Sequence, residues 1–137
     1  MGGEKGTARR SSLSVAPMKE TLIEGLEGSA TYTVTADMSP PHLPMVVLST
    51  PDMIRLIEGT CLTGISDHLE AAETTVGTHV CVSHAAAAGD GEVVEISYRL
   101  TTIDRRRLTF DTRVTCDDRV LSEGTHQRAV IDTSRFG

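Results

Sequence analysis

The sequence predicts an α+β protein in which one long helix is covered by an antiparallel β-sheet. Residues 50–69 carry a helix-start signal and an apolar stripe at helical spacing, whereas residues 76–131 alternate apolar and polar side chains with a period of two. Short turn signals separate the alternating segments, and strands joined by short turns pair antiparallel. A helix followed by such a run of strands is typical of the α+β class.

The first third of the chain is predicted to contain a tail, one strand and a loop. Residues 1–16 are small, polar and mildly basic, which favours a flexible tail in front of a single domain that spans residues 17–137. Residues 30–36 alternate with a period of two and predict a short strand. The proline-rich segment 39–44 fits neither a helix nor a central strand, so we expect a loop there.

The long helix has a clear predicted start. Thr50 can cap it, Pro51 fits the first turn, and Asp52 favours the positive end of the helix dipole. Its buried stripe is predicted to run to about residue 69 through Ile54, Ile57, Cys61, Ile65 and Leu69. Gly59 and Gly64 lie inside this helix and each costs about 1 kcal/mol relative to alanine. We therefore expect the sheet to pack unusually close to the helix at both glycines.

Four strands are predicted to follow the helix. Turn signals at Gly89-Asp90-Gly91 and Asp117-Asp118 separate some of them and favour antiparallel neighbours. The predicted strands span residues 76–84, 94–101, 108–115 and 120–131.

Chain length, composition and net charge favour some classes of binding partner over others. A chain of 137 residues with no Trp, two Phe and two Tyr has a modest aliphatic core, which gains from burying more surface in a homodimer. The formal net charge of −6 argues against a nucleic-acid partner, since such a partner requires a basic surface. An anionic small ligand remains compatible, because a local arginine cluster can bind it.

The cysteines and the hydropathy pattern predict a cytoplasmic protein. Cys61, Cys81 and Cys116 lie in apolar settings and are expected to be reduced thiols. No segment has the length of a membrane span or the pattern of a signal peptide. No histidine or cysteine pair stands at the spacing of a metal site, so we predict no metal and no cofactor.

Three residues together supply the groups required for acyl transfer. Glu58 shares the buried stripe of the helix, where a carboxylate is costly unless it is paired or protonated. Thr50 lies two turns upstream on nearly the same side, and its hydroxyl serves either as a helix cap or as a group that binds a carbonyl. His84 ends a predicted strand, where it is either a satisfied structural residue or a proton shuttle near neutral pH.

Glycine and arginine residues add candidate ligand-binding groups. The backbone N–H of Gly77 can approach a ligand closely because no Cβ intervenes, so it can stabilise an oxyanion. Arg128 lies within a predicted strand beside His126, where an arginine normally has an assigned partner. The arginines at 105–107 occupy a turn and are either a solvated charge cluster or a seat for phosphate groups.

Three separated segments resemble the fluoroacetyl-CoA thioesterase family, which belongs to the hot-dog thioesterases. These segments are residues 76–84 (VGTHVCVSH), 104–108 (DRRRL) and 124–131 (GTHQRAVI), within a match that runs from about residue 45 to residue 131. Agreement of three segments in order and spacing is far more specific than agreement of any one of them.

The resemblance implies a hot-dog fold and a homodimer that hydrolyses an acyl-CoA to the acid and free CoA at sites in the subunit interface. In the family pattern a catalytic Thr stands eight residues before a catalytic Glu, as Thr50 stands before Glu58, and a catalytic His closes the glycine-led strand, as His84 does. The substrate-contacting glycine and arginine correspond to Gly77 and Arg128. Direct attack by the carboxylate and general-base activation of water both remain open.

The segment before the catalytic Thr departs from the family pattern. The fluoroacetyl-specific enzyme carries bulky aromatic residues in a lid there, whereas residues 42–46 read HLPMV and contain no Phe, Tyr or Trp. Pro44 falls about where a lid phenylalanine stands, and Gly59 falls where the family can carry a tryptophan. We therefore predict hydrolysis of a short or small acyl-CoA without fluoroacetyl specificity.

Three other interpretations remain open at this stage. A non-catalytic acyl-CoA or small-molecule binding module would keep the same fold without turnover. An enoyl-CoA hydratase or dehydratase would require a histidine–acid pair, and no acidic residue lies near His84 in the sequence. The glycines and histidines would, in the third interpretation, serve only the dimer interface.

Overall fold

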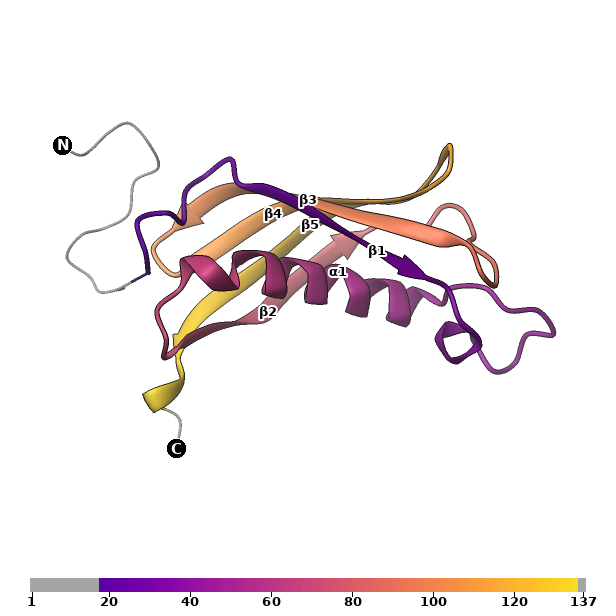
Figure 1. Cartoon of the computed structure of the whole chain (residues 1–137), viewed down its shortest axis with the longest axis horizontal. Helices are drawn as coiled ribbons and strands as arrows, with labels where there is room; N and C mark the ends of the chain where they lie inside the picture. The colour runs from indigo at the N-terminus through magenta and orange to yellow at the C-terminus, as the bar shows by residue number, and fades with distance from the viewer. Residues whose placement is uncertain (1–17, 136–137) are drawn as a thin grey trace.

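The computed structural model describes residues 18–135 and shows one antiparallel sheet wrapped around one long helix (Figure 1). The strand order is β1-β3-β4-β5-β2, and α1 lies across one face of the sheet. The elements are β1 (Glu27–Thr33), α1 (Thr50–Ile65), β2 (Glu73–Val82), β3 (Val93–Asp104), β4 (Arg107–Cys116) and β5 (Arg119–Asp132). The predicted α+β architecture is confirmed, whereas the predicted tail at residues 1–16 lies outside the described residues.

The start of α1 corrects one detail of the sequence prediction. Ser49, and not Thr50, is the N-cap: its side chain accepts a hydrogen bond from the backbone N–H of Asp52 at 3.1 Å. Thr50 is the first helical residue, so its hydroxyl is released from the capping role. The helix ends at Ile65, earlier than predicted, and a short 3₁₀ turn continues through residues 66–68.

The two glycines of α1 have different surroundings. A Cβ at Gly64 would overlap the ring of Tyr98 on β3, so the expected close approach of the sheet is present there. A Cβ at Gly59 would have no neighbour within 4 Å, so the same expectation is wrong at Gly59. Gly28 on β1 also abuts the Tyr98 ring, which is therefore clamped between two glycines.

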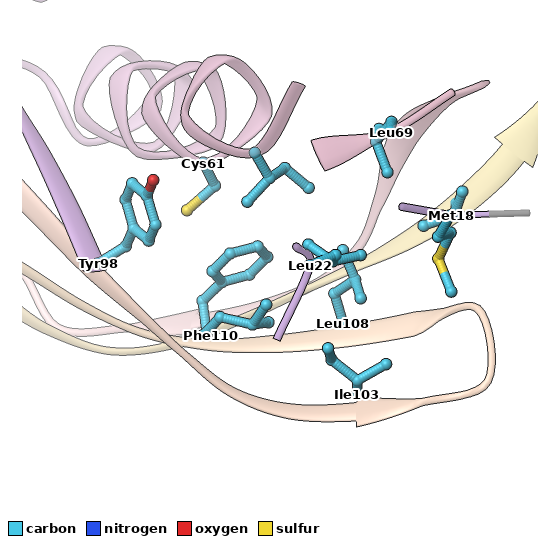
Figure 2. Packing of buried hydrophobic residues seen from close by; sticks show 11 residues of the cluster. Met18, Leu22, Cys61, Leu69, Tyr98, Ile103, Leu108 and Phe110 are labelled. Carbon is cyan, nitrogen blue, oxygen red and sulfur yellow. The ribbon is translucent and has the colours of Figure 1, made fainter. Parts of the chain in front are cut away.

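The buried face of α1 packs on the inner face of the sheet, with two apolar clusters along the helix. Figure 2 shows the cluster around the C-terminal half of α1, where Cys61 points toward Tyr98 and Phe110. These two rings meet edge to face, with their centroids 5.6 Å apart. Burial raises the pKa of the Cys61 thiol to about 12, so Cys61 stays protonated and acts as an apolar core residue.

The edge strand β2 differs from its prediction in ways that affect the site. It spans Glu73–Val82, so His84 lies two residues beyond the strand instead of closing it. Its pairing with β5 shifts between Gly77 and His79, which marks a β-bulge at residue 78. Beyond the buried Glu73, the strand carries no acidic or basic residue other than His79, and Val76 is 43% exposed. None of the helices within residues 18–135 is long and apolar enough to cross a membrane.

Candidate active site

The structure brings Thr50 and His84 into direct contact at the N-terminus of α1. The Thr50 hydroxyl oxygen lies 2.7 Å from Nδ1 of His84, so the pair forms a short hydrogen bond in which the hydroxyl donates when Nδ1 carries no proton. Thr50 is exposed and His84 is half-buried. Because Ser49 caps the helix, this hydroxyl is free to interact with a ligand and with the imidazole together.

Glu58 and Gly77 form a second contact, farther along α1. Glu58 is half-buried, and a Cβ on Gly77 would overlap its carboxylate. The same point is bordered at 3.4 Å by Nη1 of Arg128 and by Cε1 of His126. The glycine therefore provides space in which a carboxylate, a guanidinium group and an exposed strand backbone face one another.

Arg128 is held in this space by three hydrogen bonds. Its Nε donates to the Thr75 hydroxyl at 2.7 Å, its Nη2 donates to the Thr75 carbonyl at 3.0 Å, and its Nη1 lies 3.1 Å from Nε2 of His126. The residue is only 5% exposed. Burial lowers the pKa of Arg128, and the nearby Glu58 opposes that effect; a guanidinium nevertheless stays charged at neutral pH.

The Thr50–His84 pair and the second group, formed by Glu58, Gly77 and Arg128, lie along one side of the helix and are not joined directly. Thr50 and Glu58 are eight residues apart, which corresponds to a rise of about 12 Å. Helical side chains lean toward the N-terminus, so the Glu58 carboxylate leans toward the pair formed by Thr50 and His84. Among residues 18–135, no hydrogen bond connects the Thr50–His84 pair with Glu58 or Arg128.

The arginine turn at residues 105–107 divides into one structural and two exposed side chains. Arg106 donates to the Val130 carbonyl at 2.9 Å and pairs with the buried Glu73 at 3.3 Å, so it ties the β3–β4 turn to β5 and β2. Arg105 and Arg107 are exposed. The interpretation of the turn as a phosphate seat therefore concerns at most these two residues.

One group of side chains has the composition of a metal site. Ligand atoms of Glu92, Cys116 and Asp117 lie within 4.8 Å of one another. The Arg119 guanidinium lies among them, with Nη2 at 2.8 Å from the Glu92 carboxylate and 3.2 Å from the Cys116 sulfur. Since a fixed positive charge already satisfies this carboxylate, the group is explained as an ion pair and a hydrogen bond.

His126 is the site residue that sequence reasoning did not assign a role. It is completely buried, and its ring stacks on Phe110 with centroids 6.2 Å apart. The signal was present in β5: His126, Arg128 and Val130 alternate on the buried face of the strand. Two adjacent polar side chains on a buried strand face indicate a shared hydrogen-bond network, because each would otherwise be costly.

This architecture, with polar side chains gathered between a central helix and the strands around it, defines a hot-dog protein. A Thermus thermophilus protein described as a thioesterase superfamily member has the same fold: its TM-score is 0.75 at 20% identity, over 82% of this chain and 85% of that chain. The family model described as "Fluoroacetyl-CoA-specific thioesterase" matches residues 29–134. The chain belongs to this family, as the sequence resemblance predicted.

Individual relatives agree with this assignment. The fluoroacetyl-CoA thioesterase of Streptantibioticus cattleyicolor is 37% identical over 92 residues, which are 66% of this chain and 65% of that protein. This match thus spans slightly less than two thirds of the relative. A solved fluoroacetyl-CoA thioesterase has a TM-score of 0.77 at 28% identity, over 82% of this chain and 90% of that chain. A variant of it in complex with fluoroacetate and CoA has the same TM-score and identity, over 83% and 98% of the two chains.

Proposed function

We propose that this protein is an acyl-CoA thioesterase that hydrolyses a short or small acyl thioester to the free acid and CoA. The observation that carries the proposal is the arrangement along α1: Glu58 faces Gly77, and the hydrogen-bonded Thr50 and His84 lie on the same side toward the helix N-terminus. Carboxylate, hydroxyl, imidazole and exposed backbone are the groups that thioester hydrolysis uses. Family membership points to the same chemistry.

In the proposed reaction the thioester lies between the two groups of residues. Glu58 either attacks the carbonyl carbon and displaces the CoA thiolate, giving a mixed anhydride that water then hydrolyses to the free acid, or removes a proton from a water molecule that attacks the carbonyl carbon itself. The Thr50 hydroxyl and the Gly77 N–H stabilise the negative charge that develops on the carbonyl oxygen. His84 transfers a proton to the sulfur of the departing CoA thiolate, and Arg128 binds the acyl end of the substrate.

We propose that the enzyme does not discriminate between fluorinated and unfluorinated acyl groups. The loop before α1 contains no Phe, Tyr or Trp, and its apolar side chains Leu43 and Met45 are 38% and 58% exposed. We expect comparable kcat/KM values for fluoroacetyl-CoA and acetyl-CoA. A preference of 100-fold or more for fluoroacetyl-CoA would contradict this part of the proposal.

The main experiment measures release of free CoA thiol from a panel of acyl-CoA thioesters, with Glu58→Gln as the matched variant. The substitution keeps the side-chain volume and removes the carboxylate, so we expect turnover to fall at least 100-fold while acyl-CoA still binds. No turnover of any thioester by the unaltered protein, with binding retained, would favour the non-catalytic binding module. The hydratase alternative has less support, because the hydrogen-bond partner of His84 is a hydroxyl and not a carboxylate.

A homodimer formed through β2 is also part of the proposal. The outer edge of β2 is long and nearly uncharged, and such an edge is a template for pairing with another strand. The site residues Thr50 and Gly77 are both exposed in the single chain. A second copy that pairs its own β2 with this edge would cover them and exclude water from the reacting thioester.

Light scattering of an edge variant tests the dimer. Val76→Lys places a charge on the exposed edge strand, so we expect the mass in solution to fall to that of one chain, together with loss of turnover. Val93→Lys is the control, because Val93 is 52% exposed and lies on β3, away from β2. Equal masses for both variants and the unaltered protein would contradict a β2-mediated dimer.

Two further predictions belong with this proposal. We propose that residues 17–137 form one domain, since both apolar clusters share the same helix and sheet. A cytoplasmic location is proposed from the three free cysteines, two of them buried, which fit a reducing compartment.

A further inference from the structure

His126 on β5 has a defined protonation pattern in this structure. Its Nδ1 lies 2.8 Å from the carbonyl oxygen of His79, and a carbonyl can only accept, so Nδ1 carries the proton. Its Nε2 lies 3.1 Å from Nη1 of Arg128, and a guanidinium can only donate, so Nε2 is unprotonated. The two neighbours together select the neutral imidazole with its proton on Nδ1.

The two hydrogen bonds of His126 lead to different parts of the candidate active site. His79 is the residue directly after the β2 bulge, and Gly77 is the residue directly before it. The imidazole therefore fixes the strand backbone next to the glycine that faces Glu58. On its other side, it fixes the guanidinium of Arg128.

The hydrogen bonds of Arg128 leave part of the guanidinium available. A guanidinium group has five N–H donors, and Arg128 directs one each to the Thr75 hydroxyl, the Thr75 carbonyl and His126. Within residues 18–135, two N–H groups of Arg128, one on Nη1 and one on Nη2, have no acceptor. The direction in which they point is set by the three bonds that are made.

We infer that His126 is a positioning residue: as a neutral imidazole protonated on Nδ1, it holds Arg128 and the backbone beside Gly77 in register with the Glu58 carboxylate. This assignment goes beyond the proposed function, on which only its kinetic consequences rest. His126 acts through Arg128 and Gly77 and does not itself touch the reacting atoms.

The charged and titratable groups that face His126 are Arg128 on its own strand, His79 on β2 and Glu58 on α1. Burial is the largest influence and lowers the pKa of His126; the bond to the His79 carbonyl opposes this, Arg128 reinforces it, and Glu58 opposes it. Protonation would place an N–H on Nε2 against the N–H of Arg128. Because the pKa is lowered, the arrangement persists in the folded protein below the ordinary histidine value of about 6.5 and is lost only at more acidic pH.

Two substitutions separate the two bonds of the imidazole. His126→Asn keeps a short amide N–H for the His79 carbonyl and removes the acceptor for Arg128. His126→Gln reaches toward Arg128 with an amide oxygen and removes the donor to His79. The matched control is Phe110→Leu, which disturbs the ring stacked on His126 and changes no hydrogen bond.

Kinetics are compared at pH 8, at a temperature where all variants are folded. We expect kcat/KM to fall at least tenfold in both histidine variants, mainly through KM in His126→Asn, because that variant releases Arg128. We also expect the acid-side decline of the unaltered enzyme below about pH 6.5 to persist in Phe110→Leu and to weaken in both histidine variants. Values within twofold of the unaltered enzyme, or an equal loss in Phe110→Leu, would overturn the inference.

A measurement without turnover keeps the inference independent of the proposed reaction. Long-range ¹H–¹⁵N correlation spectra of the folded protein at pH 8 report which ring nitrogen of His126 is protonated, with His126→Asn used to assign the signals. A proton on Nδ1 is expected. A proton on Nε2, or a ring that is positively charged at pH 8, would overturn the inference whether or not any thioester is hydrolysed. Absence of turnover with a proton on Nδ1 would count against the thioesterase proposal alone.

Discussion

The two groups of candidate site residues are held by the fold in different ways. Thr50 and His84 meet at a surface through one hydrogen bond of 2.7 Å, and Thr50 is exposed. Arg128 is 5% exposed and makes three hydrogen bonds, and its partner His126 is completely buried. Variants of the buried group should therefore change folding and activity together, whereas variants of the exposed pair should change activity alone.

Arg128→Met is expected to have the largest effect on stability. It leaves the Thr75 hydroxyl and Nε2 of His126 without partners in a buried setting, so the free energy of unfolding should fall by about 3 kcal/mol. Urea denaturation measures this change. The control is Arg107→Met, because Arg107 is exposed, and its stability should be unchanged. Equal stability of the two variants would mean that the buried group is no better anchored than the surface.

The second-largest expected effect is a loss of stability at acidic pH that depends on His126. The pKa of His126 is lowered in the folded protein, chiefly by burial, so the unfolded chain binds the proton more readily. The contribution of neutral His126 to the free energy of unfolding is complete above about pH 6.5 and is lost as the pH falls toward the folded pKa. The free energy of unfolding should fall by at most about 1.4 kcal/mol per pH unit over this range. Urea midpoints measured from pH 8 to pH 5 should decline less steeply in His126→Asn. Parallel declines would assign the loss to other groups.

Gly77→Ala should change activity more than stability, because Gly77 borders the buried Arg128 and His126 but is itself exposed. Its Cβ would meet the end of the Glu58 side chain, which is flexible and half-buried, so the free energy of unfolding should fall by less than about 1 kcal/mol. Displacement of the carboxylate should lower kcat/KM at least tenfold. Gly59→Ala is the comparison, because a Cβ there meets nothing within 4 Å and should stabilise the helix. Unchanged kinetics in Gly77→Ala would remove Gly77 from the site.

Thr50→Val should have the smallest effect on stability and still abolish most of the activity. The residue is exposed and does not cap the helix, so the change in unfolding free energy should stay within about 0.5 kcal/mol. Its neighbour should behave in the opposite way: Ser49→Ala removes the cap and should cost about 1 kcal/mol with turnover largely retained. Thermal unfolding and CoA-thiol release are measured on the same samples. If Thr50 were the structural residue, Thr50→Val would lose more stability than Ser49→Ala and would retain more turnover.

Much of the fold followed from local patterns in the sequence. The period of two predicted β3, β4 and β5 because each of these strands has one buried face, and their observed bounds extend the predicted ones by a few residues. The end of α1 was less predictable. Leu69 is buried like the apolar residues of the helix, so the apolar stripe continues although Leu69 lies beyond the 3₁₀ turn of residues 66–68 and has an extended backbone.

The sequence named candidate site residues, but it did not predict how they are arranged in space. Spacing along α1 predicted Thr50 and Glu58 on nearly the same side of a helix; in the structure Thr50 contacts His84, just beyond β2, and Glu58 faces Gly77 on β2. The bulge at residue 78 shifts the alternation of β2, and no local pattern announced it. The selection of Ser49 over Thr50 as the cap depended on a difference of one residue, which capping preferences do not resolve because both types are favoured.

Tyr98 has a consequence for how this sequence can change during evolution. Its ring occupies space that a Cβ at Gly28 or at Gly64 would need, and these glycines lie on β1 and α1, far apart in the chain. Substitution of either glycine alone creates a clash, whereas a smaller residue at position 98 would admit alanine at both. Homologous sequences should therefore show the three positions varying together, which would reveal a contact between the helix and two strands without any structure.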